Sequence, residues 1–272
     1  MSGFLQQACR EARERVAEAA GLVPLGVLRD APAPPPRPLV PAIAGPGVAV
    51  IAEIKRASPS RGHLAWVPDP VPRAHAYVAG GAVAVSVLTE PAHFHGTLAD
   101  LTAVAAATSV PVLRKDFVVE PYQVWEARAA GASALLLIVA ALDDETLVGL
   151  LGETADAGLD ALVEVHDETE AARAGAALAA ARYPDVPVIG VNARDLTTLQ
   201  VDQGRFAACV DALPEGALAV AESGVATPGD VAEAGRAGAA AVLVGEHVVT
   251  APDPAAAVRA LVVAGGAGRS SG

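Results

Sequence analysis

The chain has 272 residues, a net charge of −12 and a pI near 4.9. This acidic balance argues against nucleic-acid binding through a broad basic surface, so an anionic ligand must meet a local cluster of Lys, Arg and backbone N–H groups. Hydrophobic residues make up 53% of the chain but aromatic residues only 3%, which predicts a core of Ala, Val and Leu. The longest strongly apolar run, Ala134 to Leu142, is too short to span a bilayer.

The two cysteines, Cys9 and Cys209, have no metal-ligand spacing and form no disulfide framework. Disulfides are rare in reducing compartments, so this cysteine usage fits the cytoplasm. The N-terminus is charged and lacks an apolar signal core. We therefore expect a cytoplasmic protein without a membrane partner.

The first 45 residues predict a helix and a connector. Apolar side chains recur along one side of residues 4–20, and Gly21 and Pro24 are expected to end this helix. Residues 31–38 contain five prolines, which exclude a helix or a central strand and predict an extended connector. We expect this extension to span residues 1–45, a barrel to span 46–266, and a disordered tail to span 267–272.

From residue 48 onward, short β-branched runs alternate with Ala-rich amphipathic segments. The predicted strands span 48–54, 82–89, 111–116, 134–139, 160–166, 187–193, 217–223 and 241–246. The predicted helices span 70–79, 98–107, 121–130, 143–157, 168–180, 202–213, 228–237 and 254–264. This alternation predicts an α/β fold, a (β/α)₈ TIM barrel with an N-terminal helical extension. A doubly wound open sheet is the alternative, but its Gly-x-Gly-x-x-Gly turn is absent.

Polar residues gather where the predicted strands end, which is the active-site face of such barrels. A solitary charge at a strand end is more often solvated than catalytic. Here, however, five acid, base or amide side chains fall within one or two residues of the end of an apolar run: Glu53, Lys55, Lys115, Glu164 and Asn192. Glu53 and Lys55 also point to the same side of their strand, and burying a charged pair there is costly unless it has a function.

Two further patterns concern anions and metals. Ser223-Gly224 and Gly245-Glu246 follow the last two strands, where these barrels bind phosphate with backbone N–H groups and a short extra helix, here 247–250. Ser58 in the first loop is placed to complete that site. His93, His95 and the Glu164–His166 pair offer metal ligands without an evident third partner, so we expect no metal.

Five ordered motifs carry a resemblance to a known family. They are Ile51-Ala52-Glu53-Ile54-Lys55-Arg56-Ala57-Ser58-Pro59-Ser60, Leu113-Arg114-Lys115-Asp116-Phe117, Leu162-Val163-Glu164-Val165-His166, Gly190-Val191-Asn192-Ala193-Arg194-Asp195-Leu196 and Ala221-Glu222-Ser223-Gly224. In this order they resemble the indole-3-glycerol-phosphate synthase family, in register from about residue 48 to about 250. The N-terminal helix also fits that family.

The resemblance implies a lyase of tryptophan biosynthesis that needs no cofactor. Its substrate, 1-(2-carboxyphenylamino)-1-deoxyribulose 5-phosphate, yields indole-3-glycerol phosphate, CO₂ and water. The resemblance makes Lys115 the acid that protonates the ketone oxygen and Glu164 the second proton-transfer group. It places Lys55 beside the leaving carboxylate, with Glu53 orienting the lysines. Asn192 and Ser223 would hold substrate hydroxyls, with Arg194 close by.

The resemblance also assigns the two ends of the substrate. The aromatic ring would lie among Phe94, Phe117, Leu136, Leu199 and Val244, and the phosphate on Ser58, Gly224, Gly245 and Glu246. Some family members carry Ser where Glu246 stands, so this carboxylate must point away from a bound phosphate. We expect a monomer or a weak homodimer that takes a phosphorylated small molecule and no nucleic acid.

Two other functions fit a phosphosugar barrel. The neighbouring phosphoribosylanthranilate isomerase is expected to use a Cys and an Asp, yet Cys9 and Cys209 are not at strand ends. A barrel that only binds phosphorylated metabolites would need no set of proton-transfer groups like Glu53, Lys55, Lys115 and Glu164.

Overall fold

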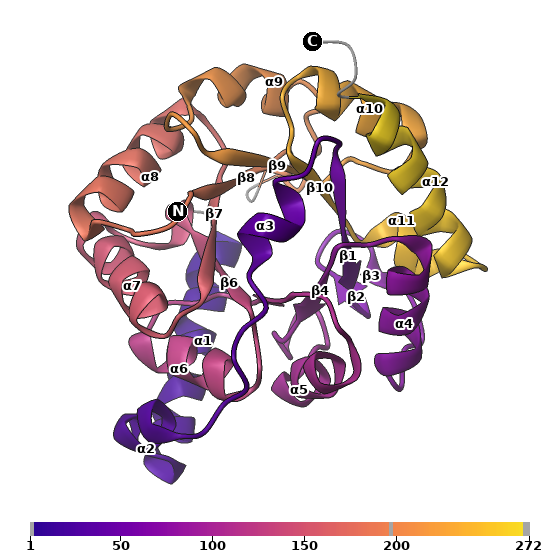
Figure 1. The fold of residues 1–272 in the computed structure, drawn as a ribbon. Coiled ribbons are helices and arrows are strands. Elements are labelled where there is room, and N and C mark those ends of the chain that lie inside the picture. The colour runs from indigo at the N-terminus through magenta and orange to yellow at the C-terminus, as the bar shows by residue number, and fades with distance from the viewer. Residues whose placement is uncertain (1–2, 196–197, 269–272) are drawn as a thin grey trace.

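The structure is a computed structural model that describes residues 3–195 and 198–268. Eight parallel strands close into a barrel in the order β1-β10-β9-β8-β7-β6-β5-β4 (Figure 1). The barrel strands are β1 (Ala49–Ile54), β4 (Ala84–Leu88), β5 (Val112–Lys115), β6 (Ala134–Ile138), β7 (Asp160–Val165), β8 (Val188–Asn192), β9 (Leu218–Glu222) and β10 (Ala241–Val244). A small hairpin, β2 (Ala57–Ser58) and β3 (Gly62–His63), follows β1. The predicted (β/α)₈ barrel is confirmed.

Helices surround the barrel and cover the outer faces of its strands (Figure 1). They are α4 (Val71–Gly80), α5 (Leu98–Ala107), α6 (Pro121–Ala129), α7 (Asp144–Asp156), α8 (Glu168–Ala181), α9 (Arg205–Cys209), α10 (Pro228–Arg236), α11 (Glu246–Thr250) and α12 (Pro254–Gly268), with 3₁₀ turns η1 (Val139–Ala141) and η2 (Val210–Ala212). Residues of β4, β6, β7 and β8 are all buried, as expected for parallel strands covered on both faces. None of the helices in the described part of the chain has the length and apolar character needed to cross a membrane.

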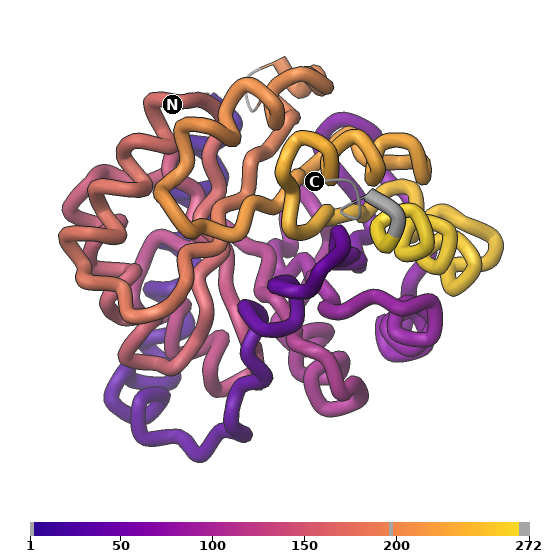
Figure 2. Tube along the Cα trace, turned by 45° about the horizontal axis from the view of Figure 1, so that its top comes forward, coloured from indigo at the N-terminus to yellow at the C-terminus, as the bar shows by residue number. Residues whose placement is uncertain are grey.

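The N-terminal extension contains three helices rather than one. Helix α1 (Gly3–Leu22) includes Gly21, which was expected to end it, and two short helices follow: α2 (Leu25–Asp30) and α3 (Leu39–Ile43). The proline-rich segment between α2 and α3 is extended as predicted and runs along the outside of the barrel (Figure 2). Arg128 on α6 donates a hydrogen bond to the carbonyl of Pro34 at 3.0 Å, which fixes this segment.

Helix α3 covers the N-terminal end of the barrel. The backbone N–H of Leu39 donates to Oδ2 of Asp160, the first residue of β7, at 2.5 Å. Leu39 and Ile43 are fully buried. This closes the barrel end opposite the predicted active site.

Two predicted boundaries differ from the structure. The helix expected over 202–213 is reduced to α9 and η2, because the carboxylate of Asp202 accepts the N–H of Gly204 at 3.0 Å and holds a turn. Helix α12 reaches Gly268, past the predicted boundary at 266; residues 269–272 of the predicted tail lie outside the described residues.

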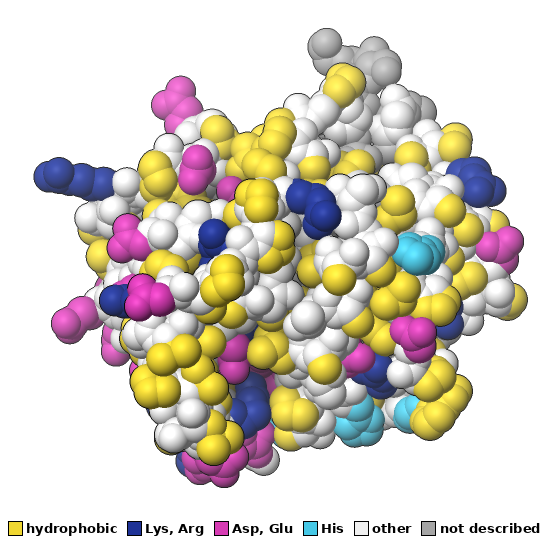
Figure 3. Space-filling view, turned by 60° about the horizontal axis from the view of Figure 1, so that its bottom comes forward, with side chains coloured by type: hydrophobic (Ala, Val, Ile, Leu, Met, Phe, Trp, Pro, Cys, Tyr) yellow, Lys and Arg dark blue, Asp and Glu magenta, His cyan; other side chains and the backbone are white. Residues whose placement is uncertain are grey.

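On the face shown in Figure 3, Lys and Arg side chains are scattered among acidic and apolar ones. A nucleic acid would require basic side chains gathered into a patch or stripe. The charge distribution on this face therefore gives no support to nucleic-acid binding.

Candidate active site

A cavity of about 520 Å³ opens at the C-terminal ends of the barrel strands. Side chains from β1, β5, β7, β8 and β9 and from the loops that follow them meet there. The predicted site residues that line this cavity are Glu53, Lys55, Ser58, Phe94, Lys115, Phe117, Leu136, Glu164, Asn192, Arg194, Leu199, Ser223, Gly224, Gly245 and Glu246. Among the predicted site residues, only Val244 does not line it.

The prediction that Val244 lines the cavity is wrong. It is 1% exposed, and its neighbour Leu243 lines the cavity instead. Successive side chains on a strand point to opposite faces, so Leu243 and Gly245 face the interior of the barrel while Val244 packs outward. In the predicted pocket for the aromatic ring, Leu243 therefore takes the place of Val244.

Lys115 is the centre of the charged part of the cavity. Its Nζ donates to Oε2 of Glu164 at 2.8 Å and to Oε2 of Glu222 at 2.7 Å. The Lys115 side chain is 12% exposed, and both carboxylates are 2% exposed. A buried ammonium is thus held between two buried carboxylates, an arrangement that fixes its position and preserves its charge.

The pKa shifts of this group follow from burial and charge together. Burial alone would lower the pKa of Lys115, but the carboxylates of Glu164 and Glu222 outweigh it and raise the pKa. Burial acts to raise the pKa of Glu164, yet Lys115 and then His166 hold it below its usual range. Burial raises the pKa of Glu222 to about 7, with Lys115 opposing and Glu164 reinforcing the shift. The two carboxylates therefore have separated proton affinities, as in acid–base pairs.

Glu222 belongs to the charged group around Lys115, yet it was assigned no role from the sequence. The Ala221-Glu222-Ser223-Gly224 motif contains it, but only the Ser and Gly were assigned roles. The usable signal was its position at the end of β9, equivalent to that of Glu164 on β7. A Cβ at Gly190 on β8 would collide with the Glu222 carboxylate, so this glycine gives Glu222 its space.

Lys55 forms a second pair in the same cavity. Its Nζ lies 3.1 Å from Oε1 of Glu53, and Ser86 donates to Oε2 of Glu53 at 3.4 Å. A Cβ at Gly245 would collide with the Glu53 carboxylate and crowd the end of Lys55. Gly245, predicted only as a phosphate ligand, also makes room for this pair.

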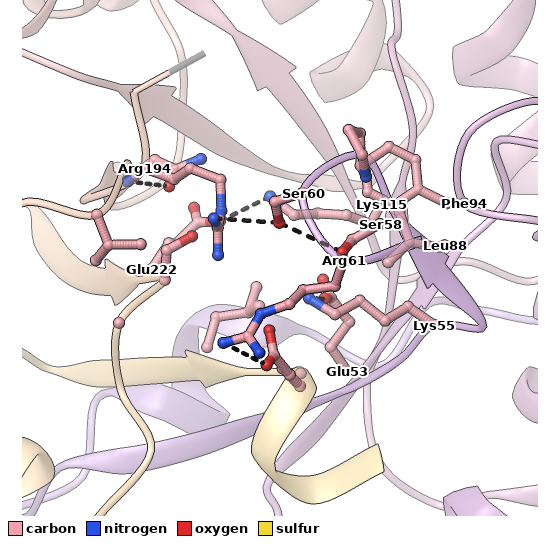
Figure 4. A pocket seen from close by; sticks show the side chains of 18 of the residues that line it. Glu53, Lys55, Ser58, Ser60, Arg61, Leu88, Phe94, Lys115, Arg194 and Glu222 are labelled. Atoms are coloured by element: carbon pink, nitrogen blue, oxygen red, sulfur yellow. Dashed lines mark hydrogen bonds and ion pairs between the residues drawn. The ribbon is translucent and has the colours of Figure 1, made fainter. Parts of the chain in front are cut away.

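The opposite side of the cavity is rich in hydroxyls and backbone donors. Ser58 and Ser60 Oγ lie 3.5 Å apart, and Arg194 Nη1 approaches Ser60 Oγ at 3.4 Å (Figure 4). Ser223 and Gly224 both adopt positive φ, 64° and 76°, which turns successive backbone groups toward one side. Such a concave run of N–H groups is suited to an anion.

Glu246 does not stand free beside this anion site. Arg61, on the β2–β3 hairpin, reaches across the cavity mouth and places Nη2 3.3 Å from Oε1 of Glu246 (Figure 4). The pair is partly exposed, so it screens the carboxylate from a nearby anion without adding much stability. Arg61 was not assigned a role from the sequence.

The apolar end of the cavity contains three aromatic rings. The centroids of Phe94 and Phe117 lie 6.4 Å apart, and Phe4 of α1 meets Phe117 edge-on at 6.0 Å. Leu136 and Ile138 of β6 form the adjacent wall, as their apolar run predicted. Phe4 was not predicted to line the cavity, and through it the N-terminal helix contributes to the site.

Among the described residues, one group combines three side chains of metal-ligand type: Glu11, Glu90 and His93. Glu90 already accepts the backbone N–H groups of Ala92, His93 and Phe94, at 2.7 to 3.1 Å. Glu11 accepts from the His93 ring at 2.8 Å. These hydrogen bonds hold α1 against the loop after β4. They explain why the three side chains lie together without requiring a bound ion.

A barrel with lysines and carboxylates at its strand ends, beside a glycine-lined anion site, defines a class of enzymes that act on phosphorylated small molecules. The family model described as "Indole-3-glycerol phosphate synthase" matches residues 5–261. The chain belongs to the indole-3-glycerol phosphate synthase family.

Individual relatives agree with this assignment. A Mycobacterium avium protein named indole-3-glycerol phosphate synthase is 54% identical over 255 residues, covering 93% of this chain and 91% of its own. A Mycobacterium ulcerans protein of the same name is 56% identical over 235 residues, covering 86% and 84%. Among solved structures, a thiamine phosphate pyrophosphorylase from Pyrococcus furiosus matches with a TM-score of 0.60 at 15% identity, over 83% of this chain and 98% of that one. This last likeness concerns the fold alone.

Proposed function

We propose that the chain is an indole-3-glycerol-phosphate synthase, which converts 1-(2-carboxyphenylamino)-1-deoxyribulose 5-phosphate to indole-3-glycerol phosphate, CO₂ and water. One observation carries the proposal: the Lys115 ammonium is held between Glu164 and Glu222 in a cavity with one aromatic and one anion-binding end. The substrate has the same three parts, an aromatic carboxylate, a ketone and a phosphate.

Ring closure begins when the ring carbon that bears the carboxylate attacks the ketone. Negative charge develops on the ketone oxygen, and the Lys115 ammonium protonates it. The carboxylate then leaves as CO₂, and its electron pair restores the aromatic ring. Lys55, paired with Glu53 in the same cavity, supplies the positive charge that holds the carboxylate until that step.

Loss of water completes the indole. Glu164, whose pKa is held low by Lys115 despite its burial, is the base that takes the proton from the carbon next to the nitrogen. Asn192 donates a hydrogen bond to Glu164 and holds a substrate hydroxyl together with Ser223. Arg194 lies close to these hydroxyls, and its Nη1 donates to the carbonyl of Leu199 at 2.9 Å.

The phosphate of the substrate binds at the anion-binding end of the cavity, and its aromatic ring binds at the apolar end. The phosphate occupies Ser58 and the N–H groups of Gly224, Gly245 and Glu246, while Arg61 keeps the Glu246 carboxylate turned away. The aromatic ring lies against an apolar wall made by Phe94, Phe117, Leu136, Leu199 and Leu243.

The two alternative functions fit the site less well. Neither cysteine lines the active-site cavity, which removes the Cys expected of the isomerase. A barrel that only binds its ligand has no use for a lysine between carboxylates of separated pKa.

The decisive test is a fluorescence assay for indole-3-glycerol phosphate with the purified enzyme and no added metal. Lys115→Ala is expected to lower kcat by at least about 10²-fold, the usual scale of a lost general acid. Product binding and the far-UV circular dichroism of this variant should remain those of the wild type. Turnover close to normal in Lys115→Ala would remove this residue from the role of acid.

We also propose a cytoplasmic monomer or weak homodimer. Both cysteines are buried as free thiols, which supports a reducing compartment. Analytical ultracentrifugation across a hundredfold range of concentration would measure the association, and a concentration-independent dimer would contradict it.

A further inference from the structure

A second cavity of about 770 Å³ lies beside the active site, on the far side of the end of β7. Its lining includes His166, Glu170 and Arg173, and it shares no lining residue with the active-site cavity in the described part of the chain. Glu164 lines the first cavity and His166 the second, only two residues apart in sequence. The pair therefore forms part of the wall between the two cavities.

Only one of the two nitrogens of the His166 ring has a hydrogen-bond partner among the described residues. Its Nδ1 lies 2.9 Å from Oε2 of Glu170, which also accepts the backbone N–H of His166 at 2.8 Å. Its Nε2 is buried and has no hydrogen-bond partner in the structure, yet it lies 3.5 Å from Oε1 of Glu164. A buried polar atom without a partner requires an explanation, and here the nearest charged group is a catalytic carboxylate.

The proposed reaction creates a need for a proton. The ketone oxygen gains one proton during ring closure and a second when it leaves as water, whereas only one proton returns, from the carbon next to nitrogen. The carboxylate leaves as CO₂ without contributing a proton. Each turnover therefore consumes one proton from solvent, and this proton must reach a cavity that substrate fills.

We propose that this proton enters through His166, which connects the second cavity to Glu164 and Lys115. The N–H bond at Nε2 of the imidazolium breaks as an O–H bond forms at Oε1 of Glu164. A half-turn of the Glu164 carboxyl group then carries this O–H to the position of Oε2, 2.8 Å from Lys115 Nζ. There the O–H bond breaks as an N–H bond forms on the Lys115 amine, after Lys115 has given its own proton to substrate. Water in the second cavity then returns a proton to the neutral imidazole. This inference rests on the proposed function, and His166 acts through Glu164 as a positioning residue.

The charges around the ring favour the imidazolium. They are Glu164 on β7, Glu170 and Arg173 on α8, Arg205 on α9, Glu222 on β9 and Asp195 in the loop after β8. Arg173 is engaged by Asp144 at 2.7 Å, and Arg205 donates to the carbonyl of Asn192 at 3.3 Å. Burial alone would lower the pKa of His166, but Glu170 and Glu164 outweigh it and raise the pKa. The direction of this shift favours the protonated ring.

The kinetic test uses His166→Gln, His166→Ala and the control Thr169→Ala, an exposed residue in the wall of the same cavity. His166→Gln should lower kcat by about 10-fold or more while KM stays close to that of the wild type. Added imidazole should restore kcat of His166→Ala in a saturable way, because the second cavity can admit it. Thr169→Ala should behave as the wild type and show no response to imidazole.

A wild-type kcat in His166→Gln would overturn the inference. So would a low kcat in His166→Ala that no concentration of imidazole restores, since this would mean that the ring only supports the structure.

A second measurement needs no turnover. Histidine titration by NMR should show a lower pKa for His166 in Glu164→Gln than in the wild type, and an unchanged pKa would refute the coupling. If the wild-type enzyme forms no indole-3-glycerol phosphate, the proposed function fails and the delivery step fails with it. The NMR result would then still decide whether the Glu164–His166 pair is coupled.

Discussion

Five charged residues share the floor of the active site, and their charges do not balance. Glu53, Glu164 and Glu222 face only two ammonium groups, those of Lys55 and Lys115. Three neighbouring carboxylates in a buried site cannot all remain ionised cheaply, so one of them retains a proton to near neutral pH. Glu222 is that residue, with its pKa raised to about 7 by burial first and by Glu164 in addition.

The raised pKa of Glu222 predicts a pH-dependent stability. The folded protein binds this proton up to about pH 7, whereas an unfolded glutamate releases it near its ordinary pKa of 4.5. The stabilisation is therefore complete below pH 4.5 and is lost as the pH rises toward 7. Glu222→Gln removes this dependence.

Urea unfolding from pH 4.5 to 7.5 measures the effect. The free energy of unfolding of the wild type should fall relative to that of Glu222→Gln across this window. A constant difference between the two proteins would mean that Glu222 is ionised throughout.

At the level of secondary-structure elements, the strands position the charges and small residues on neighbouring strands make room for them. The side chain of Glu222 on β9 reaches Gly190 on β8, where a Cβ would collide with its carboxylate. Not every glycine of the chain has to make room for a neighbouring side chain in this way. Gly149, exposed in α7, has no atom within 4 Å of such a Cβ.

These two glycines give a matched pair of substitutions. Gly190→Ala should lower kcat on the order of 10²-fold, since moving the Glu222 carboxylate that holds Lys115 by about 1 Å has effects of that size. Gly149→Ala should leave kcat unchanged and raise the free energy of unfolding by about 0.5–1 kcal/mol, because Ala is the better helix former. Steady-state kinetics and urea unfolding of both variants check this, and a normal kcat in Gly190→Ala would contradict it.

Helix α1 is attached to the barrel by a buried charge. Arg15 donates to Oδ1 of Asp116, which is 2% exposed, at 2.9 Å. Arg13, on the same helix, meets Glu120 only at 3.8 Å and is 53% exposed. The two arginines therefore differ both in their own burial and in that of their partners.

Arg15→Ala should lower the free energy of unfolding by about 1.5–3 kcal/mol, the range for a hydrogen bond to a charged group. Arg13→Ala should change it by less than about 1 kcal/mol, as is usual for exposed ion pairs. Equal effects of the two substitutions in denaturant unfolding would show that Asp116 does not depend on α1.

For the whole molecule, closure of the barrel brings helix α12 against the start of β1. Helix α12 packs against both α4 and α10 (Figures 1 and 2), and the N–H of Val48, just before β1, donates to the carbonyl of Gly265 at 3.1 Å. Leu261 of α12 is fully buried in this contact, while Val263 is 69% exposed.

Leu261→Ala should therefore destabilise the protein by about 2–5 kcal/mol, the cost of a large cavity in a packed core. Val263→Ala, on the same helix, should have little effect. Urea unfolding followed by circular dichroism gives both values. A small effect of Leu261→Ala would mean that α12 is dispensable for closure of the barrel.

The sequence by itself determined the (β/α)₈ barrel, the family and the strand ends that carry Lys55, Lys115, Glu164 and Asn192. These depend on local signals, namely the alternation of apolar runs with amphipathic segments and the polar residues that interrupt each run. The N-terminal helix and the extended proline segment are also local, since proline restricts its own backbone.

Tertiary structure alone decided which groups share a contact. Glu222 was visible as a motif residue, yet its pairing with Lys115 joins positions 107 residues apart. Val244 and Leu243 could be distinguished only by the direction in which β10 faces, because a shift of one residue reverses the face of a strand. Phe4, Arg61 and His166 reach the site or its wall from a helix and two loops, so their roles depend on packing that no local pattern encodes.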